Sequence, residues 1–216
     1  MTIRFADKAD CAAITEIYNH AVLHTAAIWN DRTVDTDNRL AWYTPVREAL
    51  LRLVSSSALA VAPAQAFMVP EISLESLLEI NTIRTALEEM AVVAAAGKIT
   101  PDREQTLNAL LDEFQQALES GVMEKILLAN RAFRFEIYHY ADMPTLYAMI
   151  EQLWVRLGPS LHFLYDNFKL DDYQNGVNLY RKLLNALVTG DKEASRHCLQ
   201  NVLQQNVATI KNQYFM

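Results

Sequence analysis

The sequence predicts a mainly α-helical protein in which an antiparallel bundle of about six helices follows a helix–hairpin module and a short α/β segment. About half of the 216 residues are hydrophobic, which is enough to build a sizeable core. Five glycines and six prolines are few turn residues for this length, and this favours long helices. From Ser73 onward, apolar residues recur at the three- and four-residue spacing of amphipathic helices.

The first 43 residues predict the α/β segment. Residues 2–6, TIRFA, alternate polar and apolar side chains, which predicts a short strand. Residues 7–23 place their apolar side chains on one helical face, which predicts a helix. The stretch that continues to Tyr43 has mixed periodicity and several Asp and Asn residues, so we expect an irregular connection there.

Residues 44–70 predict a helix followed by a β-hairpin. Thr44 and Pro45 form an N-cap and first-turn pair, so the helix is expected to begin there. The strings LAVAP and FMVPE then alternate in strand fashion around a short link that contains Gln65. A helix followed by a hairpin, with Arg47 on the outer face of the helix, is the second half of a winged helix-turn-helix. This piece is therefore a candidate DNA-reading module.

Residues 71–216 predict the helical bundle as one domain. Ser73 and the pair Thr100–Pro101 are helix starts, and Gly121 is a helix end. Further helices are expected over 122–140, from Pro144 through Trp154, over 171–188 and over 191–213, with a kink or break at Gly158–Pro159 and a separation at Gly190. Because the links are short, consecutive helices are expected to run antiparallel.

The bulk properties predict a soluble cytoplasmic protein. The formal net charge is −7, and an acidic protein gains little from the phosphate backbone of DNA outside a locally basic stretch such as residues 44–70. Cys11 and Cys198 are far apart and belong to no ligand cluster, so both are expected to be reduced thiols. No apolar run approaches the roughly 20 residues that span a bilayer, so no membrane partner is expected.

The stretch that begins at Thr44 also carries a family resemblance. TPVREALLRLVSSSALAVAPAQAFMVPEISLESLLEINTIRTALEEMA resembles the recognition helix, wing and first effector-domain helix of FadR-type regulators of the GntR family, in the same order and spacing. The resemblance extends to the C-terminus. It implies a DNA-binding transcriptional regulator rather than an enzyme, with an FCD-type effector domain for a small molecule. An operator DNA and a second copy of the chain, in a homodimer, are the implied partners.

The residues before Thr44 carry a different resemblance. Residues 1–43, through EIYNHAV and TAAIW, resemble the opening of phosphinothricin-type N-acetyltransferases of the GNAT fold. They stand where GntR regulators carry two helices that support the recognition helix, so the DNA-binding half is expected to be impaired. One alternative is a dimerising interaction protein that does not bind DNA. The other is a remnant N-acetyltransferase, but no two glycines lie close enough to form the loop that cradles a pyrophosphate.

The resemblance implies three DNA-contacting residues. Thr44 and Arg47 would meet DNA from the recognition helix, and Gln65 would lie at the tip of the wing near the minor groove. Arg47 can bond guanine with two parallel hydrogen bonds. The alternative is that Arg47 is a solvated helix residue that pairs with nearby acids.

Many relatives are expected to hold a divalent metal inside the bundle through an Asp, a His four residues later and two further His. The matching positions in this chain are Asn130, Arg134, Tyr180 and Val202. None is a strong metal ligand, and an arginine repels a cation. The sequence therefore predicts no metal and no cofactor.

The same interior predicts an effector site that is polar and partly cationic. Its predicted effector-binding residues are Asn81, Arg84, Asn130, Arg134 and Tyr180. Buried arginines prefer carboxylate or phosphate partners, so a small organic anion is the expected effector. The alternative is that the arginines are neutralised within the chain, Arg84 by Glu88 one turn on and Arg134 by an acid such as Glu136 or Glu151.

Overall fold

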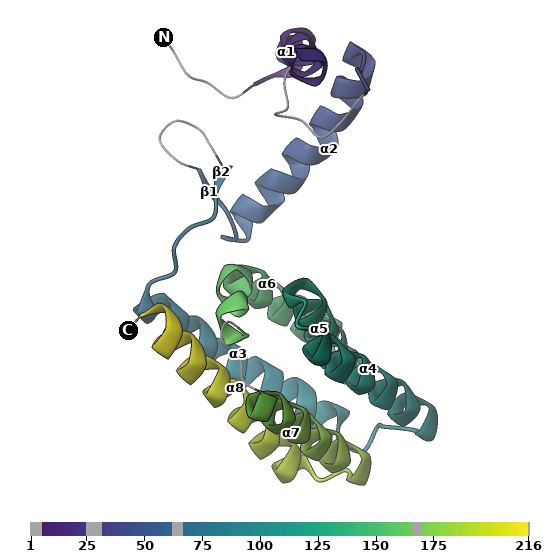
Figure 1. Ribbon diagram of the computed structural model, residues 1–216. Helices are drawn as coiled ribbons and strands as arrows, with labels where there is room; N and C mark the ends of the chain where they lie inside the picture. The colour runs from purple at the N-terminus through teal and green to yellow at the C-terminus, as the bar shows by residue number, and fades with distance from the viewer. Residues whose placement is uncertain (1–5, 25–31, 62–66, 166–169, 216) are drawn as a thin grey trace. The chain divides into compact units, whose positions relative to one another are not determined.

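The computed structural model describes residues 6–24, 32–61, 67–165 and 170–215, apart from the side chains of residues 159, 162 and 170–174. The chain divides into two compact units, Met1–Pro70 and Glu71–Met216 (Figure 1). The strand predicted for residues 2–6 falls largely outside the described residues, and Gln65 lies outside them as well.

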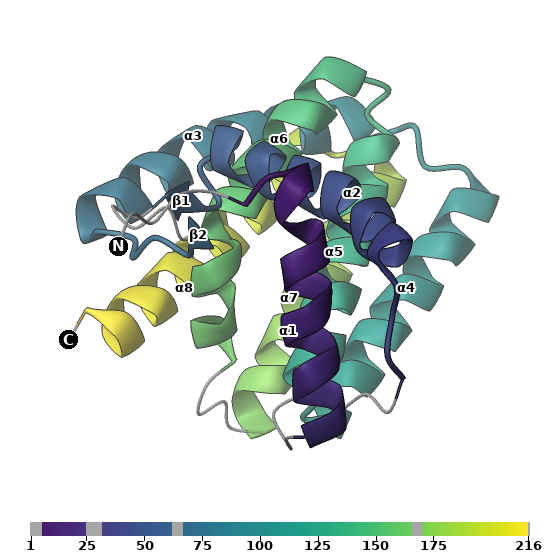
Figure 2. The same cartoon turned by 90° about the horizontal axis from the view of Figure 1, so that it is seen from above.

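The N-terminal unit contains two helices and a small hairpin. A 3-10 turn, η1 (Lys8–Asp10), leads into α1 (Cys11–His24), and the Asp7 carboxylate caps the turn by accepting from the amide of Ala9. Helix α2 (Thr36–Ser55) packs against α1 (Figure 2). Strands β1 (Ala60–Val61) and β2 (Phe67–Met68) pair antiparallel, which confirms the predicted hairpin.

Helix α2 begins eight residues before the predicted start at Thr44, so that prediction was wrong. The N-cap is Asp35, whose carboxylate accepts from the amide of Asn38 at 2.7 Å. Pro45 therefore lies inside the helix, where its ring removes one backbone hydrogen bond. Packing of the first half of α2 against α1 favours the continuous helix, with the Arg39 guanidinium 3.7 Å from the centre of the Tyr18 ring.

The second unit is a bundle of six α-helices, which confirms the predicted architecture. The helices are α3 (Leu74–Ala95), α4 (Pro101–Ser120), α5 (Met123–His139), α6 (Pro144–Leu161), α7 (Leu170–Thr189) and α8 (Lys192–Tyr214), with a 3-10 turn, η2 (His162–Leu164), after α6. Ser73 and Thr100 cap α3 and α4 through their side chains, and Gly121 ends α4 in the left-handed conformation, as predicted.

The predicted break at Gly158–Pro159 does not occur, because α6 continues to Leu161. Pro159 lies in the last turn of the helix, where only a single backbone hydrogen bond is lost. The helix then tightens into η2. Within the described parts of the chain, no helix is both long enough and apolar enough to cross a membrane.

Helix α3 is the central helix of the bundle. It packs against α8, α6 and α5, while α4 packs against α5 and α7, and α7 against α8. Two glycines let the ends of α3 and α7 meet. Gly97 and Gly190 both have positive φ, and a Cβ on Gly190 would lie 3.4 Å from the Cα of Gly97. Buried apolar side chains from all six helices form one large cluster, and a second, smaller cluster lies around Leu77, Leu157 and Ile210.

Candidate functional site

A buried carboxylate on α3 accepts hydrogen bonds from four donors. The Oε1 atom of Glu88 lies 2.5 Å from Nε of Arg84 and 2.9 Å from Nε1 of Trp154. Its Oε2 atom accepts from Nη2 of Arg134 and from the hydroxyl of Tyr138. Arg84 and Glu88 are one turn apart on α3, and Arg134 and Tyr138 are one turn apart on α5, so each pair lies on one helix face. We call these five residues the Glu88 cluster.

The Glu88 cluster holds one more positive than negative charge. Burial raises the pKa of Glu88, but the coulombic effects of Arg134 and then Arg84 outweigh it and leave the pKa below its ordinary value. Burial alone would lower the pKa of Arg134, yet Glu88 raises it overall. Two guanidinium groups thus share one carboxylate. Nη2 of Arg84 is buried and has no hydrogen-bond partner.

A second polar chain, formed by two tyrosines and an asparagine, lies beside the Glu88 cluster. The hydroxyl of Tyr180 donates to Oδ1 of Asn130 at 2.8 Å, and Nδ2 of Asn130 donates to the Tyr165 hydroxyl at 2.6 Å. Burial raises the pKa of Tyr180 above its ordinary value, and the nearby Arg134 guanidinium opposes that rise only in part. Both phenols are therefore neutral groups.

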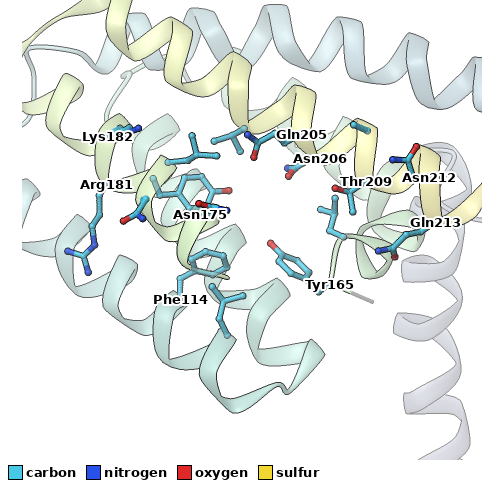
Figure 3. Close-up of a pocket in the computed structure, with 18 of the residues that line it drawn as sticks. Phe114, Tyr165, Asn175, Arg181, Lys182, Gln205, Asn206, Thr209, Asn212 and Gln213 are labelled. Atoms are coloured by element: carbon cyan, nitrogen blue, oxygen red, sulfur yellow. The ribbon is translucent and has the colours of Figure 1, made fainter. Parts of the chain in front are cut away.

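These tyrosines form part of the wall of a cavity of about 870 Å³ between α4, α7, α8 and the residues around η2 (Figure 3). Its apolar part is made by Phe114, Leu118, Leu164, Leu179, Val202 and Ala208. Its polar wall is built mainly from amide side chains, namely Asn175, Asn178, Asn185, Gln205, Asn206, Asn212 and Gln213, with Thr209. The charged lining residues are Arg181 and Lys182, and the lining includes no acidic side chain of the described residues.

The structure brings four of the five predicted effector residues together. Arg84 and Arg134 meet at Glu88, and Asn130 bonds Tyr180. Asn81 is half-buried on α3 and stands apart from them. Of the five residues, Tyr180 alone lines the cavity.

The two buried arginines are partly neutralised within the chain, because both pair with the one carboxylate of Glu88. Arg84 pairs with Glu88 as that alternative stated, but Arg134 pairs with Glu88 as well, rather than with Glu136 or Glu151. Glu151 instead bonds Arg131 at 2.6 Å.

The role of Glu88 as the hub of this site, with its partners Tyr138 and Trp154, was not predicted from the sequence. A signal was present, because Arg84 and Glu88 fall on the same helical stripe as the buried residues Leu77, Ile80 and Ala91. Charged residues on an apolar stripe are buried only when they are paired. Tyr165, which was not predicted either, follows η2 and had no such periodic signal.

The side chains at the four positions where relatives are expected to bind a metal lie close together but do not suit a divalent cation. Asn130 already uses its amide on the two tyrosines, and Arg134 places a cation among them. Tyr180 is a neutral phenol, and Val202 supplies only alkyl groups to the cavity wall. In the described ranges, no three His, Cys, Asp or Glu side chains gather as a metal site.

The candidate DNA-reading residues lie in the N-terminal unit. Arg47 is exposed in the middle of α2, and Thr44 is half-buried one turn before it. None of the side chains of α2 is buried. Several large apolar side chains of this unit are exposed, among them Ile17, Trp42, Leu51, Leu53 and Met68.

Comparison with known proteins assigns the bundle. The family model described as "FCD domain" matches residues 79–205. The "HTH-type transcriptional regulator McbR" of Escherichia coli (strain K12) is 53% identical over 171 residues, which are 79% of this chain and 77% of that protein. The solved structure of E. coli McbR/YncC superposes with a TM-score of 0.75 at 46% identity, covering 94% of this chain and 98% of that one.

A second set of relatives consists of acetyltransferases. The "L-amino acid N-acyltransferase MnaT" of E. coli (strain K12) is 81% identical over 43 residues, 20% of this chain and 25% of that protein. A longer match, 39% identical over 173 residues, is to an acetyltransferase of Salmonella typhimurium and spans 80% of this chain and 96% of that protein. That span necessarily includes much of the helical bundle, for which the FCD model and the regulator structure provide the better account.

Proposed function

The chain belongs to the GntR-family transcriptional regulators with an FCD effector domain, and from this premise we propose that a small organic anion is its effector and binds inside the bundle. The observation that supports an anion is the net positive charge of the Glu88 cluster, where two guanidiniums share one carboxylate. A buried excess charge is costly unless a counter-charge approaches. Effector binding would then alter operator binding by a homodimer in the cytoplasm.

The cavity between α4, α7 and α8 supports the same ligand charge. Its charged lining residues are Arg181 and Lys182, and behind Tyr180 lies Arg134, so the potential inside it is positive. Amide groups around the wall can donate hydrogen bonds to carboxylate oxygens. In this proposal Arg84 and Arg134 supply charge, Tyr180 forms the inner wall, and Asn130 lies behind it and accepts the hydrogen bond of the Tyr180 hydroxyl. Asn81 stays a prediction from the sequence.

The test is calorimetric titration of the full chain with a panel of organic acids. Arg84→Ala and Arg134→Ala should each weaken binding of any acid that the wild type binds. Arg131→Ala is the matched control, because Arg131 lies on the same helix as Arg134 and pairs with Glu151 at the surface. If the first two variants bind as the wild type does, Glu88 alone satisfies the arginines and the anion proposal fails.

We also propose that the chain is organised as an acetyltransferase-like segment (1–43), a partial winged helix (44–70) and the effector domain (71–216). Thr44, Arg47 and Gln65 are the proposed DNA contacts. Specific binding is expected to be weak, because α2 contacts α1 but buries none of its side chains, which gives little support for fixing a recognition helix in the major groove.

A gel shift with the operator of the E. coli relative tests this DNA role. Arg47→Ala should reduce any shift more than Arg156→Ala, which removes the same charge from the exposed surface of α6. Equal effects of the two variants would show that Arg47 does not contact DNA. Absence of a shift, together with loss of the relative's own shift on mixing, would favour an interaction protein that forms mixed dimers.

A further inference from the structure

The charges inside the bundle come from three side chains. Among the residues that the structure describes, the buried charged ones are Arg84, Glu88 and Arg134. Tyr138 and Trp154 complete the contacts of Glu88 and are neutral. The interior therefore carries one fixed positive charge in excess, and the protein alone supplies it.

Arg134 is held in place by contacts with three side chains of the Glu88 cluster. Its Nη2 donates to Glu88, its Nε donates to the Tyr138 hydroxyl at 3.0 Å, and its guanidinium carbon lies 5.1 Å from the centre of the Trp154 ring. The side chain is 1% exposed. A planar group with fixed donors on two edges cannot swing away, so its charge has a defined position.

That position lies among the side chains where relatives are expected to bind a metal. Arg134 is one turn from Asn130 on α5 and adjoins Tyr180, whose pKa responds to the guanidinium. Tyr180 and Val202 both line the cavity. A guanidinium there excludes a divalent cation by its charge and by the space it fills, while it keeps the site positive.

We propose that the guanidinium of Arg134, positioned by Glu88 and lying behind Tyr180 rather than in the cavity wall, replaces a divalent metal as the fixed cation of the bundle interior, and that the cavity between α4, α7 and α8 binds a small carboxylate without metal. The ligand part rests on the proposed effector function, whereas the replacement of the metal does not.

Zinc titration of the full chain, purified without chelators, tests the replacement. The wild type should bind no zinc in the bundle. The fourfold variant Asn130→Asp/Arg134→His/Tyr180→His/Val202→His should gain one zinc ion per chain, because its ligands would converge and Glu88 would remain neutralised by Arg84. Arg131→His is the control, since it adds a histidine to the same helix at an exposed position. Stoichiometric metal in the wild type, or none in a folded fourfold variant, overturns the proposal.

If circular dichroism shows that the fourfold variant is not helical, Asn130→Asp/Arg134→His takes its place with two changes and should bind zinc more weakly than the full set. If the folded double variant binds zinc no more tightly than Arg131→His does, the proposal that Arg134 replaces a divalent metal is likewise overturned.

Acetate and benzoate test the ligand part by thermal shift at constant ionic strength with EDTA present. Acetate or benzoate should stabilise the wild type and Arg131→Ala but not Arg134→Ala. A shift that EDTA removes overturns metal independence. If neither monocarboxylate shifts the melting temperature, the ligand class is wrong, and so is the anion effector proposed above. The zinc titration then still decides whether Arg134 replaces a divalent metal.

Discussion

The two units of the chain differ in how they use their apolar side chains. In the bundle, α3 to α8 bury a shared core, and residues such as Leu77, Leu107 and Phe133 are fully enclosed. In the N-terminal unit, a 20-residue helix, α2, buries no side chain, and Trp42 is 49% exposed. An apolar pattern in sequence therefore gives a stable fold only where the complementary surface is part of the same unit.

This difference locates the stability of the molecule in the bundle. The described buried residues of the N-terminal unit are Cys11, Thr15 and Ala58, which are small. Their burial contributes little hydrophobic free energy beside that of the large core side chains. We therefore expect substitutions in the bundle to change global unfolding, and matched substitutions in the N-terminal unit to change it little.

Glu88→Ala is expected to have the largest effect. It leaves two buried guanidiniums without a carboxylate, and removal of one partner from a buried ion pair costs about 3–5 kcal/mol. Urea unfolding followed by circular dichroism measures the loss. The matched control is Glu151→Ala, which removes a surface ion pair to Arg131 and should cost less than about 1 kcal/mol. Similar losses in the two variants would mean that Glu88 is not the hub of the interior.

Phe133→Ala tests the contrast between the units directly. Phe133 is fully buried, and the centre of its ring lies 5.0 Å from the centre of the Tyr180 ring. Its truncation to alanine should therefore cost about 3–5 kcal/mol of unfolding free energy. Leu51→Ala on α2 removes a side chain that is 42% exposed and should cost less than about 1 kcal/mol. Measured by the same unfolding assay, a large loss for Leu51→Ala would show that Leu51 is enclosed in solution, and the contrast would fail.

The free energy of unfolding at acidic pH is expected to depend on the Glu88 cluster. The pKa of Glu88 in the folded protein lies below its ordinary value of 4.5, so its stabilising contribution is present above that pH and is lost as the pH falls through the lower, folded value. Glu88→Gln removes this titration. Unfolding free energies measured along a descending pH series should therefore fall more steeply below pH 4.5 in the wild type than in the variant. Parallel curves would contradict an ionised Glu88 in the native state.

The bundle could be predicted from sequence because each of its helices carries its own boundaries and its own apolar stripe. Ser73, Thr100 and Gly121 act locally, through hydrogen bonds and backbone conformations within a few residues. The start of α2 could not be predicted in the same way. Thr44–Pro45 is a good local start signal, but Asp35 is another, and packing against α1 decides between them.

The candidate site was predictable as a set of residues but not as a network. Arg84, Asn130, Arg134 and Tyr180 followed from the family resemblance, and the structure brings them together. That Glu88 serves both arginines depends on α3 and α5 meeting in space, across 46 residues of sequence. No local pattern specifies such a contact, which is why Glu136 and Glu151 were equally plausible partners for Arg134.

Asp35→Ala addresses the N-terminal unit itself and has the smallest expected effect. Asp35 accepts from the amide of Asn38 and caps α2, and removal of such a cap costs about 0.5–2 kcal/mol of local helix stability. Because α2 buries no side chain, the loss should appear as faster amide hydrogen exchange in the first turns of α2 and not as a change in global unfolding. Thr44→Ala is the control, since a helix that began at Thr44 would reverse the two results. Faster exchange in Thr44→Ala alone would place the helix start where the sequence first suggested, and would mean that Pro45 lies in the first turn rather than within a continuous α2.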